Sequence, residues 1–193
     1  MADKMVDQTS GQATLRYSHG AATFHWLTAA MVLGQIWVGL QFADMPKGPE
    51  RMQLFMVHKT LGVAILLVTL LRLGYRLMHR PPPYPADLPR LDRFVAVWSH
   101  RLFYGLLVAL PLTGLIAASG KAKNGMVDLL WGLQVPALPL GEGLGEVHAA
   151  LAWATIALLI LHIAGGVWHQ WIRRDHAAGR MPPLQPKDDS GIA

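Results

Sequence analysis

The stretch VHAALAWATIALLILHIAGGVWHQWI fills residues 147–172 and contains no Asp, Glu, Lys or Arg. An α-helix rises about 1.5 Å per residue, so about 20 apolar residues cross the roughly 30 Å hydrocarbon core of a bilayer. This stretch therefore predicts a membrane-spanning helix. It also carries His148 and His162, and because polar groups inside a membrane cost free energy, both histidines are candidates for a function.

Three further stretches predict membrane helices. Residues 17–43 and 102–120 contain no charged side chain. The stretch from about 54 to 78 is interrupted by one lysine and two arginines, but its centre, LGVAILLVTLL, is apolar, and long basic side chains near helix ends can extend to water. The sequence thus predicts an all-α fold, an integral-membrane four-helix bundle.

The composition agrees with a membrane protein. Hydrophobic residues make up 52% of the 193-residue chain and charged residues 15%, whereas soluble domains average roughly 25% charged residues. Cysteine is absent, which excludes disulfides, thiolate zinc sites, cysteine-ligated iron–sulfur clusters and covalent c-type haem attachment. Any metal must therefore use other ligands, and nine histidines are available.

The basic residues are distributed unevenly between the two sides of the predicted bundle. Of the 17 Lys and Arg residues, 12 flank one side and five flank the other. Because cytoplasmic loops carry the excess of basic residues, both termini are expected in the cytoplasm. Topology then explains the net charge of +5, and no nucleic-acid partner is expected. The 12 residues on the cytoplasmic side are Lys4, Arg16, Arg72, Arg76, Arg80, Arg90, Arg93, Arg101, Arg173, Arg174, Arg180 and Lys187.

The segments outside the helices predict one domain with two tails. Residues 1–18 are expected to form a cytoplasmic N-terminal tail, and residues 19–175 the transmembrane domain. Residues 176–193 are rich in proline and polar side chains, a composition that predicts a disordered cytoplasmic tail. The one long outside loop covers residues 121–145, and its segment VDLLWGL predicts a short helix at the membrane interface.

The histidines fall into two pairs at different depths. His148 and His162 are 14 residues apart, which places them roughly 40° from the same helix face and about 21 Å apart along the axis. His25 opens the first helix on the cytoplasmic side and His58 opens the second on the outside. Antiparallel helices therefore pair His25 with His162, called the inner pair here, and His58 with His148, called the outer pair.

Two histidines that face each other across a helical bundle suit a haem iron held at both axial positions. Such an iron has no open position, which favours electron transfer over oxygen binding. Zinc requires three or four protein ligands at one point, and two histidines at each depth are too few. The pattern therefore predicts two haems rather than a zinc site.

Other polar residues are expected near these pairs. Arg72 follows His58 by 14 residues, so it lies on the same face at the cytoplasmic level, where it either binds a haem propionate or extends to the lipid headgroups. Lys59 has the same two alternatives at the outer pair. His100 opens the third helix at cytoplasmic depth and is expected to contact a ligand or a propionate. His169 lies among tryptophans at the water boundary, a position typical of the aromatic belt.

These residues carry a resemblance to a known family. The segments ATFHWLTAAMV, LFMVHKTLGVAILLVTLLRLGYR, SHRLFYGLLVALPLTGLIAASG and GEVHAALAWATIALLILHIAGGVWHQWIRRD resemble, in order, the four helices of the bacterial cytochrome b561 family, typified by the superoxide oxidase of enteric bacteria. The resemblance covers roughly residues 17–175. It is specific because the histidines of helices one, two and four and the ALPLTGL stretch of helix three all fall in place.

The resemblance implies a protein of the bacterial inner membrane that holds two haem b groups. It implies electron transfer between an extracytoplasmic donor and ubiquinone, with superoxide as the expected donor. The implied axial ligands are the four histidines that the spacing also selects: His25, His58, His148 and His162.

Two alternative functions remain open at this point. The chain is a haem-bearing electron-transfer subunit if its donor is a periplasmic redox partner instead of superoxide. It is a transporter if its histidines form a polar path through the membrane. Bound haem distinguishes the transporter from the other two functions.

The charge asymmetry predicts the orientation of the C-terminus. A reporter that is active only in the cytoplasm should be active when fused after Ala193, because the side with 12 basic residues stays in the cytoplasm. A reporter that is active only in the periplasm should be active when inserted in the loop of residues 121–145. Strong periplasmic activity at the C-terminus would reverse the topology.

Overall fold

A computed structural model describes residues 16–84, 88–122, 124–138 and 144–184, apart from the side chains of His176 and Ala178. Four long helices dominate it: α2 (His19–Ala43), α3 (Pro49–Met78), α4 (Arg90–Ser119) and α5 (Leu144–Val167). A π-helical segment, η2 (Trp168–Arg173), continues α5. All four are long and apolar enough to span a membrane, the last as Leu144–Arg173. The predicted four-helix membrane fold is confirmed.

Local sequence explains where these helices begin. The Ser18 hydroxyl accepts a hydrogen bond from the backbone N–H of Ala21 (3.3 Å) and so caps α2, and Pro49 occupies the first turn of α3, where no backbone donor is needed. Pro111 lies inside α4. It lacks the N–H that continues the helical ladder, a loss that membrane helices tolerate when neighbouring polar groups supply other partners.

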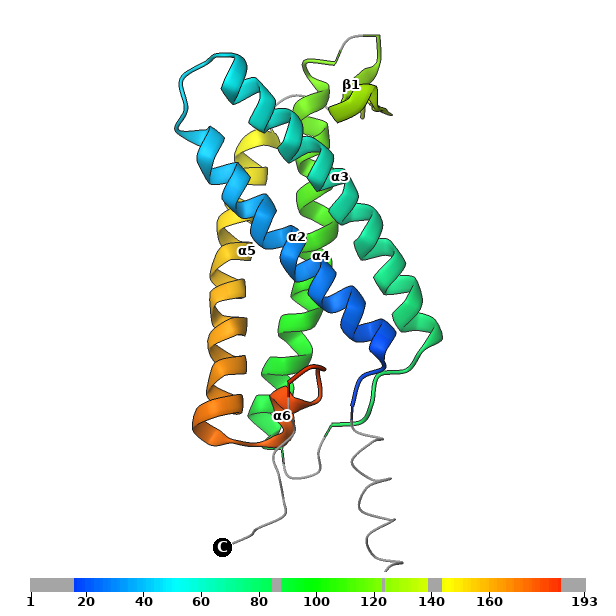
Figure 1. The fold of residues 1–193 in the computed structure, drawn as a ribbon, viewed down its shortest axis with the longest axis vertical. Helices are drawn as coiled ribbons and strands as arrows, with labels where there is room; N and C mark the ends of the chain where they lie inside the picture. Colours follow the sequence, from blue (N-terminus) through cyan, green and yellow to red (C-terminus); the bar gives the residue numbers. More distant parts are fainter. Residues whose placement is uncertain (1–15, 85–87, 123, 139–143, 185–193) are drawn as a thin grey trace, which may run out of the picture.

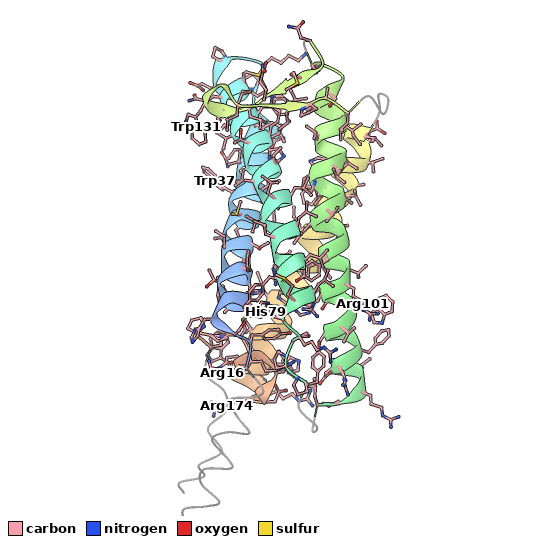
Figure 2. The ribbon with its side chains drawn as sticks, turned by 90° about the vertical axis from the view of Figure 1, so that its right-hand side faces the viewer. Arg16, Trp37, His79, Arg101, Trp131 and Arg174 are labelled. Carbon is pink, nitrogen blue, oxygen red and sulfur yellow. The ribbon has the colours of Figure 1, made fainter. Side chains whose placement is uncertain are left out.

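The helices form two layers. Helices α2 and α3 pack against each other, as do α4 and α5, and α3 joins the layers by packing against α4 (Figures 1 and 2). Within the described residues, the backbone of α5 makes no comparably close contact with α2 or α3. Side chains must therefore bridge the distance between α5 and the opposite layer.

The outside of the bundle is apolar, as expected for a surface in lipid. Large side chains of α5 point outward: Trp153 is 63% exposed and Leu161 is 70% exposed. The buried positions hold apolar residues such as Ile65 and Leu107 together with three small polar ones, Thr28, Thr69 and Thr155, each at most 3% exposed. The bundle therefore differs from a soluble one mainly in its apolar outer surface.

The short interfacial helix expected in the outside loop is wrong. The segment forms an antiparallel hairpin of β1 (Met126–Asp128) and β2 (Gln134–Pro136), joined through the one-turn 3₁₀ segment η1 (Leu130–Gly132). Trp131 and Gly132 adopt positive φ angles of 58° and 72°, which an α-helix does not allow. The hairpin is tied to α3, because the Thr60 hydroxyl accepts a hydrogen bond from the backbone N–H of Leu130 (2.9 Å).

The hairpin marks one end of the bundle, called the hairpin end here, and the chain segments near Tyr17 and Leu184 mark the other, the tail end. Part of the tail expected to be disordered is folded at this end. Residues 176–179 form the short helix α6 and the chain continues in a turn to Leu184. Residues 1–15 and 185–193 lie outside the described residues.

Arg180 explains why this part of the tail folds. It is 5% exposed, and its guanidinium donates hydrogen bonds to the backbone carbonyls of Pro82 and Pro83 and lies 4.5 Å from the ring centre of Tyr84. Its own carbonyl accepts from the backbone N–H of Tyr17 (2.9 Å). Arg180 thus joins three segments that are far apart in the sequence.

Replacing Arg180 with alanine should release residues 176–184 from the bundle. Hydrogen bonds from a charged group contribute about 1.5–3 kcal/mol, so backbone amides in this segment should exchange with solvent roughly ten to a hundred times faster. Hydrogen–deuterium exchange of the purified protein measures this. Arg90, an exposed arginine at the same end, provides the matched control, and R90A should leave the exchange unchanged. Equal exchange in R180A and the parent would contradict the role of Arg180.

Candidate functional site

The structure brings the four candidate histidines together as two facing pairs. In the outer pair, His58 on α3 faces His148 on α5, with ring centres 6.1 Å apart. In the inner pair, His25 on α2 faces His162 on α5, with ring centres 6.3 Å apart. The outer pair lies toward the hairpin end and the inner pair toward the tail end, because each α5 histidine meets a partner near the matching end of an antiparallel helix.

These separations fit a metal ion held between two imidazoles. Two ring nitrogens that bind one metal at about 2 Å each hold their ring centres roughly 6 Å apart. Among the described residues, no group of three or more His, Cys, Asp or Glu side chains could hold a metal ion. Both pairs therefore fit a haem iron, which needs only two protein ligands, better than zinc.

His148 is held in an orientation suited to binding a metal. Its Nδ1 lies 3.0 Å from the backbone carbonyl of Leu110 and 3.4 Å from the hydroxyl of Thr113, both on α4. Donation from Nδ1 to the carbonyl leaves Nε2 as the ring atom with a free lone pair. Gly114 allows the close approach, since a Cβ at this position would lie 2.9 Å from Cε1 of the His148 ring.

His58 is enclosed by residues of α2. A Cβ at Gly39 would lie 3.2 Å from Cε1 of the His58 ring, and the Phe42 ring centre is 5.1 Å away. The side-chain amide of Gln35 donates to the backbone carbonyl of His58 (3.0 Å). The His58 Nδ1 is buried and has no hydrogen-bond partner among the described residues.

The inner pair has a different set of neighbours. The Arg72 guanidinium lies 3.2 Å from Nδ1 of His25, and the rings of His100 and Phe103 lie 5.3 and 5.2 Å from that of His162. His100 is oriented by its own hydrogen bond from Nδ1 to the carbonyl of Ala96 (2.6 Å). Arg72 and His100, which the sequence placed near the inner pair, both lie beside it.

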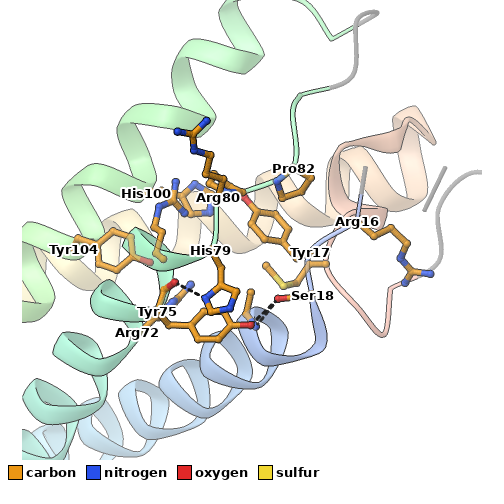
Figure 3. Close-up of a pocket in the computed structure, with 14 residues that line it drawn as sticks. Arg16, Tyr17, Ser18, Arg72, Tyr75, His79, Arg80, Pro82, His100 and Tyr104 are labelled. Atoms are coloured by element: carbon orange, nitrogen blue, oxygen red, sulfur yellow. Dashed lines mark hydrogen bonds between the residues drawn. The ribbon is translucent and has the colours of Figure 1, made fainter. Parts of the chain in front are cut away.

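A basic cavity of about 400 Å³ lies between the inner pair and the tail end (Figure 3). Arg72 and His100 line it, but His25 and His162 do not. Tyr75 also lines it, with its hydroxyl 3.1 Å from the Ser18 hydroxyl and its carbonyl 3.1 Å from Nδ1 of His79. Among the described residues, no carboxylate lines the cavity, and its other arginines are Arg16, Arg76 and Arg80.

Two other residues singled out in the sequence make contacts that the sequence did not indicate. The Lys59 ammonium donates to the backbone carbonyl of Asp128 in the hairpin (2.6 Å) and lies 5.1 Å from the ring centre of Phe55. His169 is hydrogen-bonded to the carboxylate of Asp175 (2.6 Å). Both contacts anchor neighbouring segments to the ends of the bundle.

Several residues of the two sites were not recognised in the sequence. Gly39 and Gln35 both lie close to His58. A glycine and a glutamine within an apolar helix are the features of the sequence that could have indicated them. Phe103 lies three residues after His100 and so shares its face. The carbonyl of Leu110 carried no signal, because every residue has a carbonyl.

Comparisons with known proteins agree with this geometry. A sequence profile described as prokaryotic cytochrome b561 matches residues 16–183. Cytochrome b561 homolog 2 of Escherichia coli (strain K12) is 28% identical over 179 residues, which cover 86% of this chain and 90% of the relative. The probable superoxide oxidase CybB of Yersinia pestis is 24% identical over 174 residues, which cover 87% and 96%.

A third relative, cytochrome b561 homolog 1 of Escherichia coli (strain K12), is 25% identical over 179 residues, which cover 87% of this chain and 97% of the relative. The profile spans all four membrane helices and both histidine pairs. The chain therefore belongs to the prokaryotic cytochrome b561 family, whose members are haem b proteins that transfer electrons in the membrane.

Proposed function

We propose that this protein takes electrons from superoxide at the hairpin end and passes them, through two haem b groups, to ubiquinone. The observation that carries the proposal is the presence of two facing histidine pairs, with ring centres 6.1 and 6.3 Å apart, toward opposite ends of one membrane bundle. Haem b supplies one-electron redox chemistry when bound. His58 and His148 would hold one haem iron, and His25 and His162 the other.

The overall reaction balances with two superoxide anions for each quinone. Each superoxide loses one electron and leaves as O₂, and ubiquinone gains two electrons and two protons to become ubiquinol. Superoxide is an anion, and charged species enter hydrocarbon only at high cost. It therefore reacts at an end of the bundle that faces water, which in this proposal is the hairpin end. Quinone diffuses within the bilayer and approaches from between the helices.

Two basic residues near the outer pair support an anionic donor. Arg51 donates from Nε to the carbonyl of Phe42 (3.0 Å), and Phe42 itself contacts His58. Lys59 follows His58 directly, and its ammonium donates to a backbone carbonyl, which leaves its positive charge in place. The carboxylate of Asp128, which accepts a hydrogen bond from Gln134 (2.8 Å), interacts with the Lys59 ammonium and opposes its charge. The local field is therefore a balance that mutations can shift in either direction.

The cations at the inner pair fit the carboxylates of a haem. Haem b carries two propionates, and Arg72 is positioned beside His25 with its guanidinium 5.5 Å from the ring centre of Tyr104. Arg76 contacts the same ring from 5.8 Å. We infer that Arg72 binds a propionate of the inner haem and that His100 orients His162 or a propionate. Charge-assisted contacts of this kind are the strong hydrogen bonds of proteins.

One observation favours a second candidate function, an electron-transfer subunit for a protein donor. Trp131, at the tip of the hairpin, is 85% exposed, and Leu133 beside it is 54% exposed (Figure 2). Exposed aromatic residues are enriched in protein interfaces. A periplasmic redox protein that docks on this tip would deliver electrons to the same outer pair.

The ligand assignment predicts which haem each variant loses. H58A and H148A should both lose the outer haem and keep the inner one, because each removes one of the two histidines that would hold it. H25A and H162A should do the reverse. The haem content per chain, measured as a pyridine adduct, should fall from two to about one, and the two classes of variant should retain haems with different spectra. H169A should keep both haems. Loss of the same haem in H25A and H58A would rule out the pairing.

If the basic residues near the outer pair attract superoxide, two kinds of substitution should have opposite effects on its rate of reaction. Neutralising both cations in R51Q/K59Q should slow the reduction of the protein by superoxide, and D128N should accelerate it, because the rate of an anion's approach follows the local potential. Stopped-flow mixing at low and high salt measures both rates, and both differences should shrink as salt screens the charges.

Three outcomes of that experiment are informative. Equal rates for the double variant and the parent at low salt would exclude local steering. A slower rate in D128N would show that the hairpin contact matters more than the charge. No reduction of the parent by superoxide would exclude superoxide as the donor and leave the protein-fed subunit.

A further inference from the structure

The hydrogen-bond partners of the two pairs differ in a way that bears on the direction of electron flow. On α5, His148 of the outer pair faces a backbone carbonyl, that of Leu110 (3.0 Å from Nδ1). On α2, His25 of the inner pair faces the guanidinium of Arg72 (3.2 Å from Nδ1). A carbonyl can only accept a hydrogen bond, and a guanidinium can only donate one. The two ligands therefore have opposite electrostatic environments.

The carbonyl at the outer pair favours the oxidised iron. When Nδ1–H of a metal-bound histidine donates to an acceptor, electron density moves onto the ring and the ligand becomes more basic. A more basic ligand stabilises the higher oxidation state of the metal. Leu110 is held in α4, and Thr113 also donates to its carbonyl (2.9 Å), so this acceptor has a fixed position.

The guanidinium at the inner pair favours the reduced iron. When Nε2 of His25 binds a metal, Nδ1 carries the ring proton and cannot accept a hydrogen bond from Arg72. The guanidinium then contributes a positive charge near the ring but no hydrogen bond to it. The guanidinium stays in this region even if it turns to a propionate, because it also packs against the ring of Tyr104. An added electron is stabilised by a nearby positive charge, most strongly where water is excluded.

The charge near the outer pair does not cancel this difference. Lys59 is the closest comparable cation in the sequence, but its ammonium is directed to the hairpin carbonyl of Asp128 and not to either outer histidine. Arg51 is likewise directed to the carbonyl of Phe42. At the inner pair, Arg76 adds a second cation on the Tyr104 ring beside Arg72.

We propose that Arg72 is a positioning residue that raises the reduction potential of the inner haem above that of the outer haem. With both haems bound, one electron would pass downhill from the outer haem, which would be oxidised, to the inner haem, which would be reduced, and no atom or proton would be transferred. This inference rests on the proposed function, because it needs both haems. It adds a direction and names the residue that sets it.

Potentiometric titration of the purified protein with both haems bound tests the role of Arg72. In the parent, the inner haem should be reduced first. R72Q and R72M should lower the affinity of the inner haem for an electron by tenfold or more, which corresponds to 59 mV for a one-electron couple, and should leave the outer haem unchanged. R72K should retain most of the parental potential, because it keeps the charge.

Two controls separate charge from general structure. R76Q removes a neighbouring cation that has no contact with His25, and it should shift the inner potential less than R72Q does. Each haem is assigned by repeating the titration in H58A, which should keep only the inner haem, and in H25A, which should keep only the outer one. The visible spectrum of each single-haem variant then identifies the corresponding step in the parent.

The outcomes distinguish this inference from the proposed function. Equal shifts of both haems in R72Q, no shift of either, or an outer haem that is reduced first in the parent would overturn the role of Arg72. If R72Q and R72M lose the inner haem, R72K tests the role of the charge. A parental reduction potential in R72K supports that role, and a tenfold lower affinity of its inner haem for an electron contradicts it. A parent protein that binds fewer than two haems would instead overturn the proposed function.

Discussion

Both histidine pairs depend on one helix. Helix α5 supplies His148 and His162, and their 14-residue separation corresponds to about four turns, so both rings leave the helix on nearly the same side. The opposite layer meets this requirement because α2 and α3 run antiparallel and deliver His25 and His58 near opposite ends. Within the described residues, the backbone of α5 makes little close contact with that layer. This spacing suits the pairs, since a group bound between the rings needs the helices apart.

The sequence predicted the helices and the pairs because both follow from properties read along one helix. Charge-free stretches of membrane length need no knowledge of neighbours, and the angle between His148 and His162 follows from helix geometry alone. The position of Arg72 followed in the same way from its 14-residue distance to His58, and the structure places it next to His25. Because an α-helix is regular, the face and depth of a residue can be inferred from its distance to another residue along the same helix.

The hairpin, the folded tail and the partners of the ligands could not be predicted in this way. The hairpin depends on Thr60, which is 70 residues from Leu130 in the sequence, and the tail depends on carbonyls of Pro82 and Pro83 about half the chain away from Arg180. A backbone acceptor such as the Leu110 carbonyl cannot be recognised in the sequence, because every residue has a carbonyl. Contacts of this kind emerge only when distant segments are placed together, and here they determine how the two ends of the bundle differ.

The dependence of both sites on α5 also has a consequence for biogenesis. Helix α5 is the last of the four to be synthesised, so a ribosome-bound chain that has inserted α2, α3 and α4 displays His25 and His58 without either partner. Each pair is completed only when α5 enters the bilayer and packs against α4. Under the proposed ligation, a haem can be held by both histidines of a pair only after this last helix has inserted, and one insertion step completes both pairs.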